Sequence, residues 1–316
     1  MDRDALLAAT YAIGALAVGP PSRRLLARPG RYLTAIGHRE LVYRATKRPL
    51  SVRARTAFGD DMRLLLPAST DVYLTGGKSH ESELRLARLL IRELRPGDTF
   101  VDVGAHYGYF SLLAARLVGD GGHVFAFEAA PSTHAVLADN ARARQTIEVV
   151  HAAASDRPGR LTFNEFPTYY SEYNTFDVSQ FEGQAWFAAN PPRRLEVDAV
   201  TLDGVLAKSE TRDSKAPTAA PASVIKIDVE GAEALVVRGA TDYLETHAPV
   251  VVMEYLSPAR GNASHREAAT VLRELGYYPR AIGSSGNLVL MDVDGIEPYL
   301  AARGADSVNI AFVKRA

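Results

Sequence analysis

The chain has 316 residues, which is enough for one α/β domain with an N-terminal extension. Its 36 Lys and Arg nearly balance its 37 Asp and Glu, so no bulk charge would draw it to nucleic acid or to an anionic membrane. Because it has no cysteine, disulfides, thiolate nucleophiles and cysteine metal sites are excluded, which fits a cytoplasmic location.

The first predicted element is an almost uncharged helix over residues 5–18. It is shorter than the roughly 20 apolar residues that span a bilayer, and residues 1–4 lack the basic start of a signal peptide. We therefore expect no transmembrane span. We expect the helix to be buried against the main domain or a second subunit, so a homodimer is possible; an interfacial membrane helix is the alternative.

A β-hairpin is predicted next, with strands over residues 51–58 and 62–66 joined by a turn at 59–61. This hairpin precedes the alternating strands and helices of the remaining chain. The sequence therefore predicts an N-terminal extension over residues 1–80, which would cover a substrate or contact a second subunit, and a main domain over residues 81–316.

The main domain opens with a helix predicted over residues 81–94, where apolar residues recur at helical spacing. Glu81 and Glu83 stand in its first turn, where acids suit the positive end of the helix dipole. The helix start by itself accounts for both carboxylates. If one of them also contacts a ligand, Glu81 is the candidate.

A strand, a glycine turn and a helix then come in the order of a nucleoside-binding crevice, over residues 100–117. Gly104 and Gly108 would let the backbone turn tightly and approach a ligand closely. A second strand ends in Glu128, where a carboxylate takes a ribose diol. We infer that the ligand is an adenosine derivative.

The spacing argues against a dinucleotide. A pyrophosphate needs bare amides at Gly-x-Gly-x-x-Gly, but here His106 occupies the second glycine position and Asp102 precedes the turn. S-adenosylmethionine carries an ammonium and a sulfonium and no phosphate, so an acid there suits it. The alternative is that the glycines only ease packing and that Asp102 caps the helix.

The remaining elements alternate as in right-handed parallel βαβ units. Strands are predicted over residues 123–128, 147–152, 224–227 and 250–253, helices over 131–143, 232–238 and 265–275, and a closing hairpin over 286–291 with 308–313. After the third strand, Ser155 stands in a loop expected near an adenine ring.

A long insertion over residues 160–223 separates the third and fourth strands of this sheet. Residues 163–192 are crowded with aromatic side chains, which form either a lid over an amphiphilic acceptor or a satellite core. Residues 208–222 are rich in Ser, Thr, Ala and Pro and are expected to be a mobile surface loop.

Several motifs in order resemble the FkbM family of S-adenosylmethionine-dependent methyltransferases, over about residues 81–254. They are Asp102-Val103-Gly104-Ala105-His106-Tyr107-Gly108, Phe127-Glu128 with Pro131, Asn140, Thr201-Leu202-Asp203, the block from Lys226 to Glu233, and Glu254. The resemblance implies an α/β class I methyltransferase fold, Rossmann-like, with helices on both faces of a mostly parallel seven-stranded sheet whose last strand is antiparallel.

The family usually methylates a hydroxyl oxygen on natural products, sugars or lipid-linked glycans, so the resemblance implies a small hydroxylated acceptor. Two residues depart from its pattern. His106 stands where the family most often has Asn and could still donate to the methionine carboxylate. Ala129 stands where it often has Pro, which makes the adenine-side loop less rigid.

Methyl transfer to an alcohol gains from a base that removes the hydroxyl proton. The candidates are Asp228 and Glu230, at the carboxyl end of the fourth strand, with His106 as a third; Asp228 is also a candidate for cofactor binding. The acids from Glu230 to Glu233 also suit a helix start. Lys226 needs an acidic partner inside its apolar strand.

Asp228 and Glu254 end adjacent predicted strands, and with a nearby amide they could hold Mg²⁺ against a vicinal diol. This pattern is sparse, so Mg²⁺ is possible but is not predicted. Two other functions are weighed against the methyltransferase: a non-catalytic module that binds S-adenosylmethionine, and a nicotinamide-dependent dehydrogenase.

Overall fold

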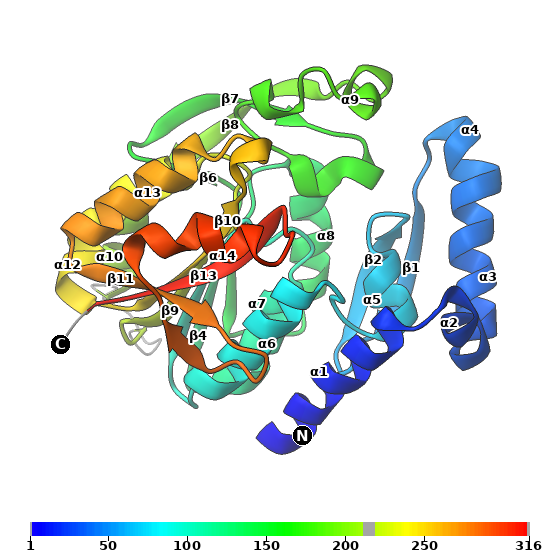
Figure 1. Ribbon diagram of the computed structural model, residues 1–316, viewed down its shortest axis with the longest axis horizontal. Helices are drawn as coiled ribbons and strands as arrows, with labels where there is room; N and C mark the ends of the chain where they lie inside the picture. Colours follow the sequence, from blue (N-terminus) through cyan, green and yellow to red (C-terminus); the bar gives the residue numbers. More distant parts are fainter. Residues whose placement is uncertain (1, 211–218, 315–316) are drawn as a thin grey trace.

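A large mixed sheet forms the centre of the computed structural model, which describes residues 2–210 and 219–314. Over these residues its strand order is β12-β11-β13-β10-β9-β3-β4-β5 (Figure 1). The strands are β3 (Thr99–Val103), β4 (His123–Phe127), β5 (Ile147–Val150), β9 (Ala222–Ile227), β10 (Val250–Leu256), β11 (Tyr277–Ile282), β12 (Leu288–Leu290) and β13 (Ser307–Lys314).

The predicted class I methyltransferase architecture is confirmed, because β3, β4, β5, β9 and β10 run parallel and β13 is inserted antiparallel between β10 and β11. Short β12 adds one strand at the edge to the expected seven. The predicted closing hairpin of residues 286–291 with 308–313 is wrong: β12 pairs with β11, a strand absent from the prediction, and β13 pairs with β10 and β11.

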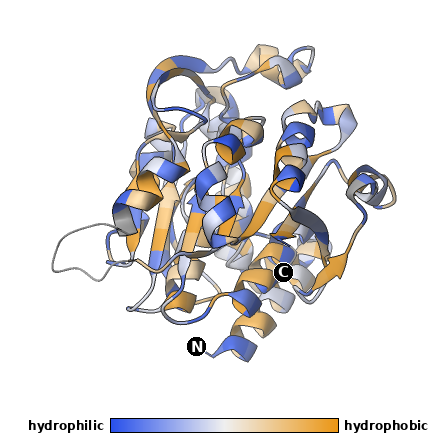
Figure 2. Ribbon diagram, turned by 90° about the vertical axis from the view of Figure 1, so that its left-hand side faces the viewer, coloured by the Kyte–Doolittle hydropathy of each residue, from blue (hydrophilic) through white to orange (hydrophobic). Residues whose placement is uncertain are grey.

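Alternate residues of the central strands feed two cores, one on each face of the sheet. Phe100 and Val224 pack on one side, whereas Val101 and Ile225 pack on the other. This is the period of two that a strand imposes, and all four residues are fully buried. Apolar strands accordingly run through the middle of the molecule in Figure 2.

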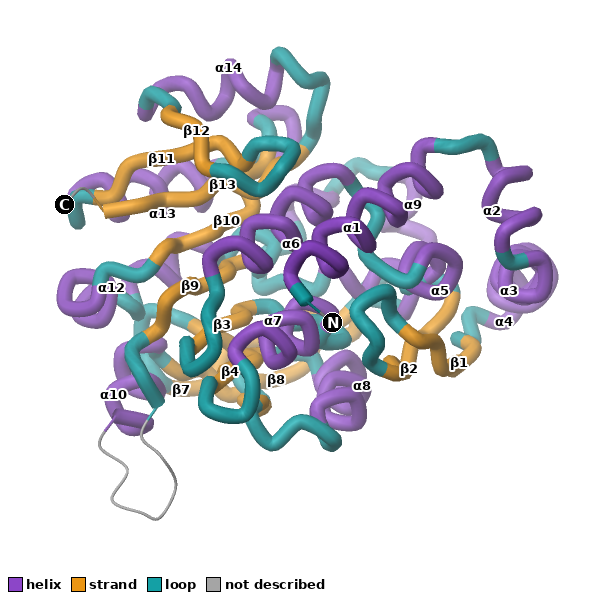
Figure 3. The backbone as a smooth tube through the Cα atoms, turned by 90° about the horizontal axis from the view of Figure 1, so that it is seen from below, coloured by secondary structure: helices purple, strands orange, loops and turns teal. Residues whose placement is uncertain are grey.

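Helices cover both faces (Figure 3). One face carries α6 (Glu81–Glu93), α7 (Tyr109–Val118) and α8 (Pro131–Ala141), and the other carries α10 (Leu202–Glu210), α11 (Glu233–Arg238), α12 (Thr241–His247), α13 (Ala263–Glu274) and α14 (Ile296–Ala301). Short helical turns η4 (Pro258–Arg260) and η5 (Val293–Gly295) lie in the connections.

The N-terminal helix α1 (Arg3–Val18) packs on α6 through Leu6, Thr10 and Ile13. The expectation of a buried helix is only half right, because Val18 is 91% exposed and Tyr11 48%. The neighbouring helices α6 and α5 cover only one side of α1. None of the helices in the described part of the chain has the length and apolar character to cross a membrane.

Further helices of this region stand apart from the sheet, at the right of Figure 1. They are α2 (Pro21–Ala27), α3 (Pro29–Gly37), the π-helical turn η1 (His38–Tyr43), α4 (Arg44–Thr46) and α5 (Thr70–Thr75). The predicted hairpin is present as β1 (Leu50–Arg55) and β2 (Asp61–Leu66). The division of the chain into an extension over residues 1–80 and a main domain stays a prediction.

A second sheet lies largely in the predicted insertion: β8 (Arg193–Val200) pairs with β7 (Gly159–Glu165) and with β6 (Ala153–Ala154), which precedes the insertion. Between β7 and β8 lie η2 (Thr168–Tyr173), η3 (Ser179–Phe181) and α9 (Ala185–Ala189). Of the loop predicted over residues 208–222, positions 211–218 lie outside the described residues, whereas 208–210 belong to α10.

Asn140 of α8 joins the hairpin to the main domain. Its side-chain oxygen accepts from the Arg63 amide at 2.6 Å, and its amide nitrogen donates to the carbonyls of Arg63 at 3.0 Å and Tyr107 at 2.8 Å. The side chain is 5% exposed. One buried amide therefore satisfies backbone groups from two distant segments.

We predict that Asn140→Ala lowers the free energy of unfolding by about 2–4 kcal/mol, because it leaves buried backbone groups unpaired. Urea denaturation followed by circular dichroism measures this. The control is Arg142→Ala, a change at an exposed residue two positions along the same chain segment. Equal stability of both variants would contradict the role given to Asn140.

Candidate active site

Gly104 brings the ends of β3 and β9 into close contact. It has φ +76°, and a Cβ at this position would lie 1.8 Å from the carbonyl oxygen of Asp228. Only glycine fits such an approach. Gly108, with φ +86°, is the N-cap of α7, and this left-handed backbone strains any residue with a Cβ. A Cβ there would also lie 2.6 Å from the end of the Leu137 side chain in α8.

Lys226 is a buried cation between the same two strands. Its Nζ lies 3.1 Å from Asp102 Oδ1 and 3.4 Å from Asp228 Oδ2, and it donates to the Gly104 carbonyl at 3.0 Å. Burial alone would lower the pKa of Lys226, but the two carboxylates raise it above its ordinary value. Lys226 therefore has the acidic partners that the sequence required.

Both carboxylate oxygens of Asp102 have partners within the protein. Its second oxygen accepts a hydrogen bond from Ser111 Oγ at 2.6 Å, and the residue is 1% exposed. The sequence placed this carboxylate beside a cationic ligand. Its charge instead holds Lys226 inside the sheet, so its effect on a ligand is indirect.

Glu128 lies at the end of β4 with its carboxylate held by three donors. The His106 amide donates to Oε2 at 2.8 Å, and the Ala130 amide at 3.0 Å and Thr133 Oγ1 at 2.7 Å donate to Oε1. Burial raises the pKa of Glu128 to about 7, against the opposing effect of these hydrogen bonds. The carboxylate is thus fixed in position and close to its titration point at neutral pH.

His106 adopts a left-handed backbone, with φ +50°, that lets its amide point at Glu128. Its ring stacks on Tyr107 at 3.8 Å, and Nε2 lies 2.9 Å from Ser171 Oγ in η2. Burial lowers the pKa of His106 to about 4, so the imidazole is neutral at physiological pH. It is therefore a hydrogen-bonding group here.

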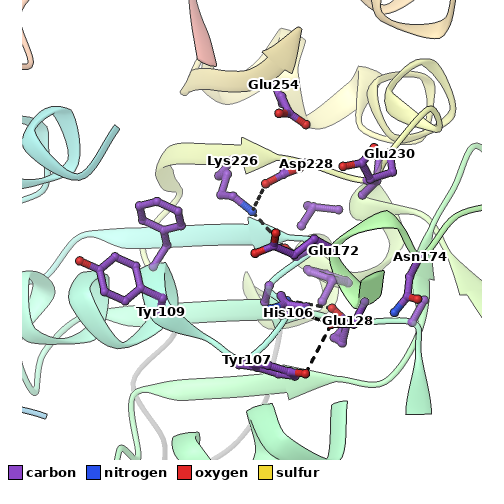
Figure 4. Close-up of a pocket in the computed structure, with 18 of the residues that line it drawn as sticks. His106, Tyr107, Tyr109, Glu128, Glu172, Asn174, Lys226, Asp228, Glu230 and Glu254 are labelled. Atoms are coloured by element: carbon purple, nitrogen blue, oxygen red, sulfur yellow. Dashed lines mark hydrogen bonds and ion pairs between the residues drawn. The ribbon is translucent and has the colours of Figure 1, made fainter. Parts of the chain in front are cut away.

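A cavity of about 1140 Å³, including its mouth, lies at the carboxyl ends of these strands. Its lining includes five of the predicted cofactor residues, Gly104, His106, Glu128, Ala129 and Asp228, and the predicted catalytic residue Glu230. Figure 4 shows Glu128 and His106 on one side of it and Asp228 on the other.

Four predicted cofactor residues do not line this cavity: Glu81, Asp102, Gly108 and Ser155. Glu81 pairs with Arg85 near the surface and faces a second cavity. Ser155 is buried beside β8, where its amide donates to the Val200 carbonyl at 2.8 Å. Ala152–Ala154, directly before Ser155, line the cavity instead.

Segment η2 of the insertion closes over the cavity. Glu172 forms an ion pair with Lys78, which also lies 3.1 Å from Glu83, and the Tyr169 amide donates to Tyr43 Oη at 3.0 Å. The N-terminal region and the insertion thus meet across the cavity. Sequence reasoning missed Lys78 and Glu172, because a single basic or acidic residue in a loop carries no local signal of its partner.

The aromatic residues of the insertion fall into two groups. Phe166, Phe181 and Trp186 form a satellite core with ring centroids 5.3 to 5.6 Å apart. Phe163 and Phe176, by contrast, line the cavity. The predicted satellite core is therefore present, whereas a lid over an acceptor stays a prediction.

Three acids line both this cavity and the second one, whose lining includes Glu172, Arg260 and Asn309. They are Asp228, Glu230 and Glu254, and one carboxylate oxygen of each lies within 4.8 Å of the others. Burial and then the charge of Asp228 raise the pKa of Glu254 to about 8. We call these three residues the acidic cluster.

The family model for the methyltransferase FkbM domain matches residues 102–279. The 31-O-demethyl-FK506 methyltransferase FkbM of Streptomyces tacrolimicus is 32% identical over 170 residues, which are 48% of this chain and 62% of that protein. The chain thus matches less than two thirds of that relative's length.

Among solved structures, the methyltransferase FkbM of Methylobacillus flagellatus is 15% identical, with a TM-score of 0.39, over 78% of this chain and 52% of that chain. The O-methyltransferase TomG of Streptomyces achromogenes is 13% identical, with a TM-score of 0.39, over 78% of this chain and 86% of that chain.

We predict that Lys226→Met lowers the free energy of unfolding by about 3–5 kcal/mol at pH 8, because it leaves Asp102 charged, buried and without its cation. Adding Asp102→Asn should restore much of this loss. Urea denaturation measures both, with Lys47→Met at an exposed lysine as the control. A Lys226→Met protein as stable as the control would show that Asp102 does not need this partner.

Proposed function

Because the chain belongs to the FkbM family of S-adenosylmethionine-dependent methyltransferases, we propose that it transfers a methyl group to a hydroxyl oxygen of a small molecule, sugar or natural product. The observation that carries this proposal is the placement of Glu128 and the acidic cluster on opposite sides of one cavity. The side with Glu128 suits a ribose, and the side with the acidic cluster suits an acceptor hydroxyl that must lose a proton.

The residues on the first side fit S-adenosylmethionine. Glu128 is a fixed carboxylate that can accept hydrogen bonds from a ribose diol, and Ala129 with Ala152–Ala154 offers an apolar wall for an adenine ring. His106 and the Gly104 turn would lie along the methionine moiety. When bound, the cofactor supplies a methyl group that is already activated by its sulfonium.

The residues on the second side fit the acceptor. We assign proton removal to the acidic cluster, with Asp228 and Glu230 as the candidates, and place His106 on the cofactor side. The acceptor O–H bond breaks and an O–CH₃ bond forms as the S–CH₃ bond breaks, which leaves a methyl ether, S-adenosylhomocysteine and a proton. The protein's main contribution is alignment, since the leaving group needs no further activation.

Two alternatives are less well supported. A non-catalytic binding module would be favoured by an inaccessible Asp228, but the side chain is 37% exposed and lines both cavities. A dehydrogenase would need bare amides for a pyrophosphate, and His106 stands in that turn.

The test is calorimetric titration with S-adenosylhomocysteine, with NAD titrated separately. We predict saturable binding of S-adenosylhomocysteine that Glu128→Ala weakens at least about 30-fold, since two charge-assisted hydrogen bonds are lost. Glu93→Ala, at an exposed acid, is the matched control, and circular dichroism checks that each variant is folded. Binding of NAD alone would refute the methyltransferase.

We also predict that S-adenosylhomocysteine binds more tightly as pH rises from 5.5 to 7. The ribose hydroxyls donate to ionised Glu128, so binding lowers the pKa that burial has raised to about 7 and releases a proton. Well below pH 7 the affinity should change by about tenfold per pH unit, and above pH 7 it should level off.

Titrations at pH 6.5 in buffers of different ionisation enthalpy measure the released proton. Glu128→Gln, which cannot titrate, is the control and should show a flat profile. A wild-type profile that is equally flat would mean that Glu128 keeps its proton on binding.

A further inference from the structure

The near balance of acids and bases in the whole chain hides one strongly basic segment. Residues 19–48 hold eight Lys or Arg and one acid, Glu40, which is a formal charge of +7 in a chain that carries −1. Glu40 pairs with Arg39 at 2.8 Å and with Arg44 at 2.7 Å. In the part of the chain that the structure describes, no other ion pair joins this segment to an acid, so most of its positive charge has no counterion in the protein.

The same segment holds a concentration of exposed apolar side chains. Nine large apolar side chains are exposed among the described residues, and five of them fall within residues 18–42: Val18, Leu26, Leu33, Leu41 and Val42. Leu26 and Leu41 are 81% and 80% exposed. A single exposed leucine needs no explanation, but such a group beside unpaired positive charge indicates a contact surface. We call residues 18–48 the basic apolar segment.

A helix over residues 29–46 shows that these leucines point away from the protein. It is continuous, because α3, η1 and α4 follow one another in helical conformation. Ala35 is fully buried against β2 and α5, on the inner side of this helix. Leu33, Gly37 and Leu41 are spaced by four positions and share the outer side, where a Cβ at Gly37 would meet only open space.

The basic apolar segment lies at the edge of the molecule and beside the second cavity. Helices α2, α3 and α4 form an outer edge in two perpendicular views (Figures 1 and 3). Val18, at the end of α1, lines the second cavity together with Ala17. A large partner can therefore reach the segment, and it would then lie next to the mouth of that cavity.

We propose that the basic apolar segment docks the protein on the surface of an anionic lipid bilayer. Leu26, Leu33 and Leu41 enter the boundary between headgroups and acyl chains, while the Arg and Lys side chains contact the lipid phosphates. This combination of exposed leucine and unpaired positive charge selects a partner that is apolar below a negative surface. The role goes beyond methyl transfer and does not depend on it.

Two other partners fit the segment less well. A symmetric pairing with a second copy of this chain would bring a charge of +7 against the same charge. A nucleic acid would attract the positive charge through its phosphates but would leave the leucines in water. An anionic bilayer satisfies both the charge and the apolar side chains.

The test sediments the full chain, without cofactor, with vesicles of phosphatidylcholine alone or of phosphatidylcholine with about 30% phosphatidylserine. We expect binding to the vesicles that contain phosphatidylserine. Raising the salt from about 0.1 M to about 1 M should remove most of this binding, since the Debye length falls from about 10 Å to about 3 Å.

The apolar part of the proposal is tested by combining Leu33→Ser with Leu41→Ser. This double variant should bind the same vesicles at least about tenfold more weakly, because two leucines no longer enter the lipid. The matched control combines Val289→Ser with Leu290→Ser, two exposed apolar residues of β12, and should bind as the wild type does. Circular dichroism checks that each variant is folded.

The charged part is tested by combining Lys47→Gln with Arg48→Gln, at two exposed residues of the segment. Binding should again weaken at least about tenfold, because each cation near an anionic bilayer contributes to the attraction. Arg142→Gln with Arg273→Gln removes two exposed cations elsewhere and should leave binding unchanged.

Three results would overturn the proposal: no binding to phosphatidylserine vesicles, equal binding to both kinds of vesicle, or unchanged binding by the double leucine variant. A wild type that sediments as a dimer without binding vesicles, and that the double leucine variant makes monomeric, would also overturn it by identifying a second copy as the partner. Because no cofactor is present, the outcome is independent of whether S-adenosylhomocysteine binds.

Discussion

The ion pair of Lys226 with Asp102 and Asp228 is the interaction on which the site depends. It joins β3 to β9 at the sheet's carboxyl edge, and the same ammonium holds the carbonyl of Gly104. Glycine lets the two chain segments touch, and the buried charge keeps them there. Without this junction, the cofactor side and the acidic cluster would have no fixed relation to each other.

The two sides of the cavity differ in how the protein hydrogen-bonds their carboxylates. Glu128 accepts three hydrogen bonds, whereas Glu230 has a carboxylate oxygen with no partner among the described residues. Both adjoining turns use a left-handed backbone at a residue other than glycine, His106 and Glu230. Such conformations cost free energy and persist where the surrounding structure holds them.

Most of the sheet could be predicted because its strands are short apolar runs that alternate with helical patterns. Gly104, Glu128 and Asp228 were also found, since each comes directly after a strand. The contacts of Asp102, Lys78 and Glu172 could not be found, because each depends on a partner supplied by another segment. β11 was missed and the pairing predicted for residues 286–291 was wrong, since pairing in a sheet depends on neighbours and not on local pattern.

The cavity wall extends beyond the part of the chain that defines the family. Met62, Ser69, Val72 and Lys78 all line it, yet all precede residue 102, where the family match begins. A chimera that transplanted only the matched segment would carry the strand ends and their acids. It would lack the cavity wall that these four earlier residues form. The segment that defines the family is therefore shorter than the segment of the chain that lines the cavity.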